Sequence, residues 1–258
     1  MKQDEIIDTL KALLDYINIH RVLSEEELRL KITEEVSKID EERRKEIEYN
    51  LGGNMEDLIF ESITTHEKLS ITSPDLHVKI NYLGEVFYCP PSHTYMEAEI
   101  KEAFLRLAMG RVDFEQFKSV VSNFLASAGY EIEVRNNEDE ILAAKDGFEP
   151  LRVHLLPTIN LAANKLESLE GDGNVLVVPT EKTPWAFVNF IHNMDDYQIS
   201  KDTMIWVVNI GKGTVDPLIG NPTDEDIALR FDNPMRARKA VKIWRASAPG
   251  DNSFLGLN

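Results

Sequence analysis

Side chains that could act in metal-dependent hydrolysis lie around the stretch DEILAAKDGFEPLRVHLLP, residues 139–157. Asp139 and Glu140 offer the hard carboxylate oxygens that Mg²⁺ prefers as ligands, and His154 offers an imidazole. A bound Mg²⁺ can activate a water molecule and stabilise the negative charge that develops on a phosphate. The residue types are therefore compatible with phosphodiester hydrolysis, provided that the fold brings them together.

The elements that would position these side chains form a regular α/β pattern. Three strands are predicted, separated by RNNED and KDGFEP, which are rich in turn formers; they cover YEIEV (130–134), EILAA (140–144) and LRVHLL (151–156). An amphipathic helix precedes them, with Asp113 as N-cap, Gln116 at the return position and Gly129 as its stop. This pattern predicts strands that carry the candidate residues beside a helix.

The pattern continues beyond the third strand. We expect a helix over 159–169, an apolar strand NVLVVP (174–179), a helix around PWAFVNFI (184–191), an apolar strand MIWVVNI (204–210) and a last helix from Asn233 to about Ala246. Helices and strands alternate in this way in α/β sandwiches. The second half of the chain is therefore predicted to be an α/β domain.

The first half is predicted to be mostly helical with one β-hairpin. Helices are expected over residues 2–16, 24–39, 40–50 and 96–110; Ser24 and Glu27 form a capping box. The segment VKINYLGEVFYC (78–89) is a predicted hairpin around Leu83-Gly84. Three helices followed by a hairpin are similar to a winged helix, but we favour a helical dimerisation or scaffolding domain. The predicted domains are 1–110 and 111–247, followed by a tail at 248–258.

The charge of the chain bears on its partners. The formal net charge is −17, with 13 basic and 23 acidic residues in 1–110 and 15 and 22 in the remainder. Because nucleic-acid binding depends on Lys and Arg neutralising phosphates, this balance disfavours nucleic acid and favours a protein partner with a basic surface. Self-association is a further alternative. No long apolar run or basic-then-apolar start is present, so we expect a cytoplasmic protein without a membrane segment.

Two further sets of residues are candidates for binding sites. Arg238, Lys242 and Arg245 in MRARKAVKIWR fall on one face of the last predicted helix and could bind phosphate or a partner. Their alternative role is pairing with the protein's own carboxylates. Cys89, the single cysteine, and His93 are too few for a zinc site, and a buried, inert thiol is the expected role of Cys89.

The order of elements over residues 112–210 resembles the restriction-endonuclease-like superfamily, the PD-(D/E)XK nucleases, and especially its Mrr-like members. FLASAGYEIEV resembles the helix exit and first strand, EILAA the second strand and LRVHLL the third. The resemblance implies a mixed sheet flanked by helices, with an Asp, a Glu or Gln and a Lys around Mg²⁺. In this sequence those positions fall on Ile141, His154 and Leu156, so the resemblance implies a degenerate member.

We therefore expect a nuclease-fold protein that is not an enzyme, holds no cofactor, and acts as a protein-interaction or regulatory module. The first alternative is a Mg²⁺-dependent endonuclease with relocated catalytic residues, drawn from Glu115, Asp139, Glu140, His154 and Lys165. The second alternative is an inhibitor whose acidic surface imitates DNA.

Overall fold

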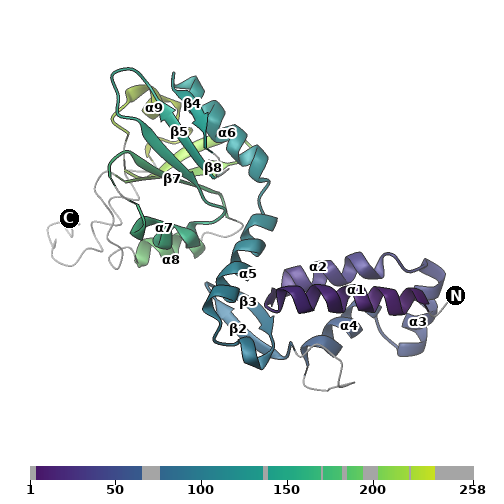
Figure 1. The fold of residues 1–258 in the computed structure, drawn as a ribbon. Helices are drawn as coiled ribbons and strands as arrows, with labels where there is room; N and C mark the ends of the chain where they lie inside the picture. The colour runs from purple at the N-terminus through teal and green to yellow at the C-terminus, as the bar shows by residue number, and fades with distance from the viewer. Residues whose placement is uncertain are drawn as a thin grey trace, which may run out of the picture. The chain divides into compact units, whose positions relative to one another are not determined.

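The computed structural model describes residues 4–65, 76–135, 139–169, 171–181, 185–193, 203–220 and 222–235. The chain divides into two compact units, Met1–Gly110 and Arg111–Asn258 (Figure 1). Most of the last predicted helix, with Arg238, Lys242 and Arg245, and the tail at 248–258 lie outside the described residues. Within the described ranges, no helix is long and apolar enough to cross a membrane.

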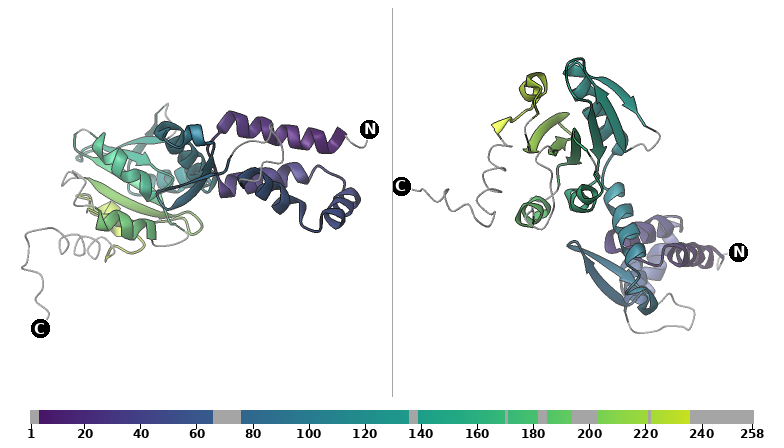
Figure 2. Two further views of the ribbon diagram at one scale, coloured as in Figure 1. Left: turned by 90° about the horizontal axis from the view of Figure 1, so that it is seen from below. Right: turned by 60° about the vertical axis from the view of Figure 1, so that its left-hand side comes forward.

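The N-terminal unit combines helices with a small sheet. Its elements are α1 (Asp4–His20), β1 (Leu23–Ser24), α2 (Glu25–Val36), α3 (Glu41–Leu51), α4 (Met55–Thr64), β2 (Val78–Tyr82), β3 (Glu85–Cys89), the 3-10 turn η1 (Pro91–His93) and α5 (Glu97–Gly110). The strands form an antiparallel sheet in the order β1-β3-β2. Helices α1, α2 and α4, drawn in purple to blue in Figure 2, bury a shared core that includes Leu13, Leu28 and Phe60.

Short-range chemistry explains several boundaries in this unit. The hydroxyl of Ser24 accepts a hydrogen bond of 3.1 Å from the backbone N–H of Glu27, which confirms the predicted cap of α2. Helix α3 ends at Gly52, whose φ of 72° suits glycine, as predicted. Leu83 and Gly84 both have positive φ and form the tight turn of the predicted hairpin.

Helix α4 was not predicted. Asn54 caps it, because its side-chain oxygen accepts hydrogen bonds from the N–H groups of Glu56 and Asp57. The cap signal was therefore present in the sequence, but it directly follows the Gly52-Gly53 stop and is easily taken for a loop.

The second unit is a mixed α/β structure. Its elements are α6 (Phe114–Ser127), β4 (Glu131–Val134), β5 (Glu140–Ala144), β6 (Leu151–Leu155), the 3-10 turn η2 (Ile159–Leu161), α7 (Ala162–Glu167), β7 (Asn174–Pro179), α8 (Trp185–His192), β8 (Met204–Asn209), β9 (Thr214–Ile219) and α9 (Glu225–Arg230). The six strands lie in the order β4-β5-β6-β7-β8-β9. The pairs β6–β7 and β7–β8 are parallel, and the pairs β4–β5, β5–β6 and β8–β9 are antiparallel.

Strand β9 and helix α9 were missed. The sequence of β9, TVDPLI, contains Asp216 and Pro217, which are unfavourable in a central strand. In the sheet order β9 is at the edge, where proline is tolerated because one side of the strand makes no ladder hydrogen bonds.

The sheet buries an apolar core on each face. One core contains Trp206 and Val153 from the sheet with Phe117 and Phe124 from α6 and Ile227 from α9. The other contains Leu176, Val178 and Ile205 together with residues of η2, α7 and α8, such as Ile159 and Phe190. Figure 1 shows α7 and α8 on one side of the strands and α6 against the other. Neighbouring residues of a strand therefore enter different environments.

Candidate functional site

Strands β5 and β6 bring Glu140 and His154 together. The antiparallel register pairs these two residues directly, so their side chains project from the same face of the sheet. The carboxylate of Glu140 is 24% exposed, and one of its oxygens lies 3.9 Å from a guanidinium nitrogen of Arg135. Glu140 is therefore a partly exposed carboxylate beside a buried imidazole.

His154 is a buried base with spare hydrogen-bonding capacity. It is 7% exposed, and its Nε2 has no hydrogen-bond partner within the described part of the chain. Burial, with the positive charge of Lys165, lowers the pKa of His154 below its ordinary value of 6.5; a hydrogen bond with Asn174 opposes this shift. The neutral imidazole is therefore favoured.

Ile141 and Leu156, which were expected to line one pocket, lie on opposite faces of the sheet. Ile141 pairs with Val153 in the register and packs in the core under α6. Leu156 packs in the core under α7 and α8. The expectation of a shared pocket was wrong, because an apolar match to the ILAA pattern does not set the phase of side-chain alternation. The β5 residue directly opposite His154 is Glu140.

The other proposed catalytic residues divide into two groups. Lys165 on α7 and Asp139 before β5 both influence the charge of His154, and the carbonyl of Asp139 accepts a hydrogen bond of 2.8 Å from the N–H of Leu155. Glu115 lies in the first turn of α6, which covers the opposite face. The structure thus brings Asp139, Glu140 and Lys165 within electrostatic range of His154 and leaves Glu115 apart. The described residues contain no group of three or more potential His, Cys, Asp or Glu ligands placed to hold a metal ion.

We expect His154 to make the second unit less stable in mild acid. Because its pKa is lower in the folded chain, the unfolded chain binds the proton more readily, and the free energy of unfolding falls as the pH drops below 6.5. In urea unfolding compared between about pH 7.5 and about pH 5.5, His154→Gln should lose part of this fall. His192→Gln, the same change at an exposed histidine of α8, should keep it. Equal losses of stability in all three proteins would contradict the expectation.

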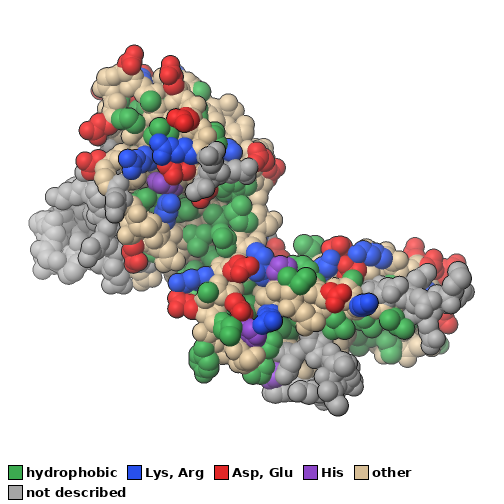
Figure 3. Space-filling model, viewed as in Figure 1, with side chains coloured by type: hydrophobic (Ala, Val, Ile, Leu, Met, Phe, Trp, Pro, Cys, Tyr) green, Lys and Arg blue, Asp and Glu red, His purple; other side chains and the backbone are tan. Residues whose placement is uncertain are grey.

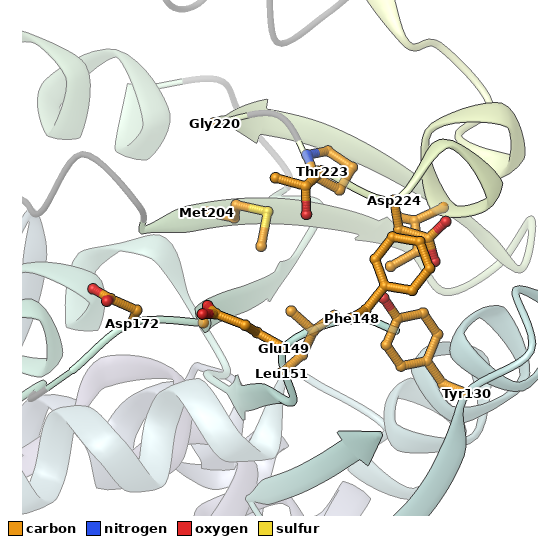
Figure 4. A pocket seen from close by; sticks show the side chains of 12 residues that line it. Tyr130, Phe148, Glu149, Leu151, Asp172, Met204, Gly220, Thr223 and Asp224 are labelled. Atoms are coloured by element: carbon orange, nitrogen blue, oxygen red, sulfur yellow. The ribbon is translucent and has the colours of Figure 1, made fainter. Parts of the chain in front are cut away.

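A separate pocket of about 290 Å³ lies at one end of the same sheet (Figure 4). We call it the sheet-end pocket. It is lined by Tyr130, Phe148, Glu149, Leu151, Asp172, Gly173, Met204, Gly220, Pro222, Thr223, Asp224 and Ile227. Figure 4 shows Glu149 and Asp172 on one side of the pocket and the two aromatic rings with Asp224 on the other, with Met204 between them. Its walls thus combine acidic, aromatic and aliphatic groups.

The aromatic side of the pocket is held by a network around Lys145. The ammonium of Lys145 lies 2.7 Å from a carboxylate oxygen of Asp224 and 2.7 Å from one of Asp226. It also lies 5.5 Å from the ring centre of Tyr130 and 4.8 Å from that of Phe148. Hydrogen bonds to Asp224 and Asp226 raise the pKa of Lys145. Lys145 is therefore a fully paired cation.

Asp224 and Tyr130 complete this network. Burial alone would raise the pKa of Asp224, but hydrogen bonds from Lys145, from the N–H of Asp226 and from Tyr130 bring it below its ordinary value. Burial and the neighbouring Asp224 raise the pKa of Tyr130 to about 12. Asp224 also caps α9 through the same N–H of Asp226. The wall of the pocket is therefore preorganised by charged and capping hydrogen bonds.

Two glycines of the pocket lining allow close approach to neighbouring segments. Gly173 and Gly220 have φ of 75° and 73°. A Cβ at Gly173 would lie 2.6 Å from the carbonyl oxygen of Pro150, and one at Gly220 would lie 3.0 Å from both Met204 Cγ and the Thr203 carbonyl oxygen. Sequence reasoning missed this pocket, because KDGFEP and GNPTDED have the composition of ordinary solvated turns.

Cys89 and His93 lie in parts of the N-terminal unit that the structure describes. Cys89 is a free, buried cysteine, as expected, and burial raises the pKa of its thiol. His93 Nδ1 instead lies 2.6 Å from a carboxylate oxygen of Glu99. These contacts connect η1 to the start of α5.

Comparison with known proteins adds one similarity. Residues 144–233 match the model of a family described as "Domain of unknown function (DUF6834), C-terminal domain". The match begins in β5 and ends after α9, and it includes every residue of the sheet-end pocket except Tyr130. No curated protein matches the chain.

Proposed function

We propose that this protein is a non-catalytic, nuclease-like α/β module that binds a protein partner with a basic surface. The nuclease-like fold is supported by the order α6, β4, β5, β6, α7, β7 and by the strand directions, an antiparallel meander followed by a parallel strand. The same order underlies the resemblance to the restriction-endonuclease-like superfamily drawn from the sequence.

The single observation that supports a loss of catalysis is that Glu140 and His154 are direct partners in the register of β5 and β6. In a PD-(D/E)XK site we would expect two oxygen ligands at the corresponding positions of these strands. Here one of the two is an imidazole, and Leu156, which directly follows β6, packs into the apolar core. Mg²⁺ requires several hard oxygen ligands in near-octahedral geometry, which this pair alone does not provide.

The choice of a basic protein partner is supported by the distribution of charge. Figure 3 shows Asp and Glu side chains spread over the described surface of both units in this view. The element order of the N-terminal unit resembles a winged helix, and α4 precedes its hairpin, where a DNA-reading helix would stand. Helix α4, MEDLIFESIT, carries Glu56, Asp57 and Glu61 and contains no Lys or Arg. Such a helix would repel phosphates and attract a basic protein surface.

We expect no cleavage of single- or double-stranded DNA or RNA by the full chain with Mg²⁺ or Mn²⁺. The variant Asp139→Ala/Glu140→Ala should behave like the unmodified protein in this assay, because neither carboxylate activates water in a non-catalytic module. Cleavage that disappears in the double variant would contradict the proposal. A second test is affinity capture with the full chain as bait. A protein partner with a basic surface should be retained at low salt and released at high salt.

A Mg²⁺- or Mn²⁺-dependent endonuclease is the second candidate function. It is favoured by the gathering of Asp139, Glu140 and Lys165 around His154, whose Nε2 has no partner in the described residues. Lys165 could supply the positive charge that the strand position Leu156 lacks. The cleavage assay above separates this function from the interaction module.

A further inference from the structure

We propose that the sheet-end pocket receives an arginine side chain of the protein partner. This inference rests on the proposed function, since it names the group by which a basic partner would be anchored. Anchors of this kind, a charged or aromatic side chain in a pocket, account for much of the energy of protein interfaces.

The volume of the pocket suits one side chain. Its 290 Å³ lie at the lower limit of pockets that hold drug-sized ligands, which start at about 300 Å³. The pocket is open at the end of the sheet between the turn before β6, the start of β7 and the segment after β9. A side chain that projects from a partner surface can therefore enter without the whole partner being enclosed.

The charge inside the pocket selects a cation. Glu149 and Asp172 are exposed, lie on the same side of the pocket in Figure 4 and have no ion pair within the described part of the chain. Lys145, whose ammonium lies 4.8 Å from the ring centre of the pocket residue Phe148, is already paired with Asp224 and Asp226. The negative potential at Glu149 and Asp172 is thus not cancelled by Lys145, which would otherwise repel a cationic guest.

The remaining walls favour arginine over a simple ammonium ion. Leu151, Met204 and Ile227 are buried and apolar, and they can contact the methylene stem of the guest. Carboxylates on one side of a pocket match the planar, many-donor guanidinium group better than they match the point charge of lysine. The Phe148 ring, 37% exposed, offers a face for stacking.

The test uses the full chain with isotope-labelled Met and Ile methyl groups and three capped tripeptides, Gly-Arg-Gly, Gly-Lys-Gly and Gly-citrulline-Gly. Citrulline has nearly the shape of arginine and no charge. In NMR titrations the arginine peptide should shift the methyl signals of Met204 and Ile227 in a saturable way. We expect binding of the citrulline and lysine peptides to be weaker by about tenfold or more, because they lose the charge or the two-pronged hydrogen bonding.

The matched variants separate a specific site from general attraction to an acidic protein. Glu149→Gln/Asp172→Asn should weaken binding of the arginine peptide by about tenfold or more. Glu131→Gln/Glu133→Gln removes the same charge from exposed positions of β4 and should change binding by less than about twofold. Neither pair of substitutions alters buried apolar contacts, so both proteins should keep the methyl spectrum of the folded chain elsewhere.

Three results would overturn the proposal: the citrulline peptide binds as tightly as the arginine peptide, the lysine peptide does so, or the two double variants weaken binding of the arginine peptide equally.

Failure of this inference can be distinguished from failure of the proposed function. If a captured partner binds Glu149→Gln/Asp172→Asn as well as it binds the unmodified chain, the interaction module stands and the arginine pocket does not. If DNA or RNA is cleaved as the endonuclease alternative requires, the proposed function fails, whereas the peptide titration still reports on the pocket.

Discussion

Replacing Trp206 by alanine should lower the free energy of unfolding of the second unit by about 3–5 kcal/mol. Trp206 on β8 is fully buried. The centres of the Phe124 and Phe231 rings each lie 5.6 Å from that of Trp206, in edge-to-face arrangements. Its removal would leave a large cavity at the point where α6, the sheet and the segment after α9 meet. Urea unfolding followed by far-UV circular dichroism measures the effect.

Two control variants show that the expected loss comes from packing. The indole Nε1 of Trp206 is buried without a hydrogen-bond partner among the described residues. Trp206→Phe should therefore cost only about 1 kcal/mol, since it keeps an aromatic ring and removes an unsatisfied donor. Trp185→Ala, at a residue 68% exposed, should change stability by less than about 0.5 kcal/mol. A Trp206→Phe protein as unstable as Trp206→Ala would argue against this account.

The second large effect is expected at Arg106, which connects α5 to the start of α2. Its Nε donates to a carboxylate oxygen of Glu27 at 3.0 Å, and one terminal nitrogen donates to the carbonyl of Val22 at 2.8 Å. The hydroxyl of Tyr16 donates to the same carboxylate of Glu27 at 2.8 Å, and burial together with this bond raises the pKa of Tyr16. Glu27 is 14% exposed, so it depends on these partners.

Arg106→Ala should destabilise the N-terminal unit by about 2–3 kcal/mol, because it leaves the Glu27 carboxylate largely buried without its cation. Glu27→Gln/Arg106→Met removes both charges and should be less damaging than Arg106→Ala alone. Lys45→Ala removes one member of an exposed pair with Glu41 and should have no measurable effect. Thermal unfolding of the three variants tests the order; equal melting temperatures for Arg106→Ala and Lys45→Ala would contradict it.

Contacts with Arg106 and Tyr16 also explain why the side chain of Glu27 does not act only as part of a capping box. The sequence pattern at Ser24 and Glu27 predicted reciprocal capping, and the Ser24 half is present. The side chain of Glu27 contacts Arg106 and Tyr16, residues 79 and 11 positions away in the chain. A long-range ion pair thus engages a side chain that local pattern analysis assigned to its own helix terminus.

The fold was predictable wherever residues close in sequence interact. Asp113 caps α6 through the N–H of Gln116, and Leu83-Gly84 closes the hairpin, as the sequence indicated. Alternating and continuous apolar runs indicated β4 to β8 in the correct order. Strand β9 escaped detection because Pro217 is acceptable only at a sheet edge, and edge position is a property of the assembled sheet.

The candidate sites depended on contacts between distant residues. The sequence pattern of residues 139–157 predicted Glu140 and His154 in neighbouring strands. The register pairs these two residues and places Ile141 in the core on the opposite face. This register arises from packing on both faces of the sheet. The sheet-end pocket joins residues from Tyr130 to Ile227 through turns that look solvated in the sequence. Capping and periodicity act over about four residues and are written locally. Strand phase and pocket walls arise only when segments tens of residues apart exclude water from a common core.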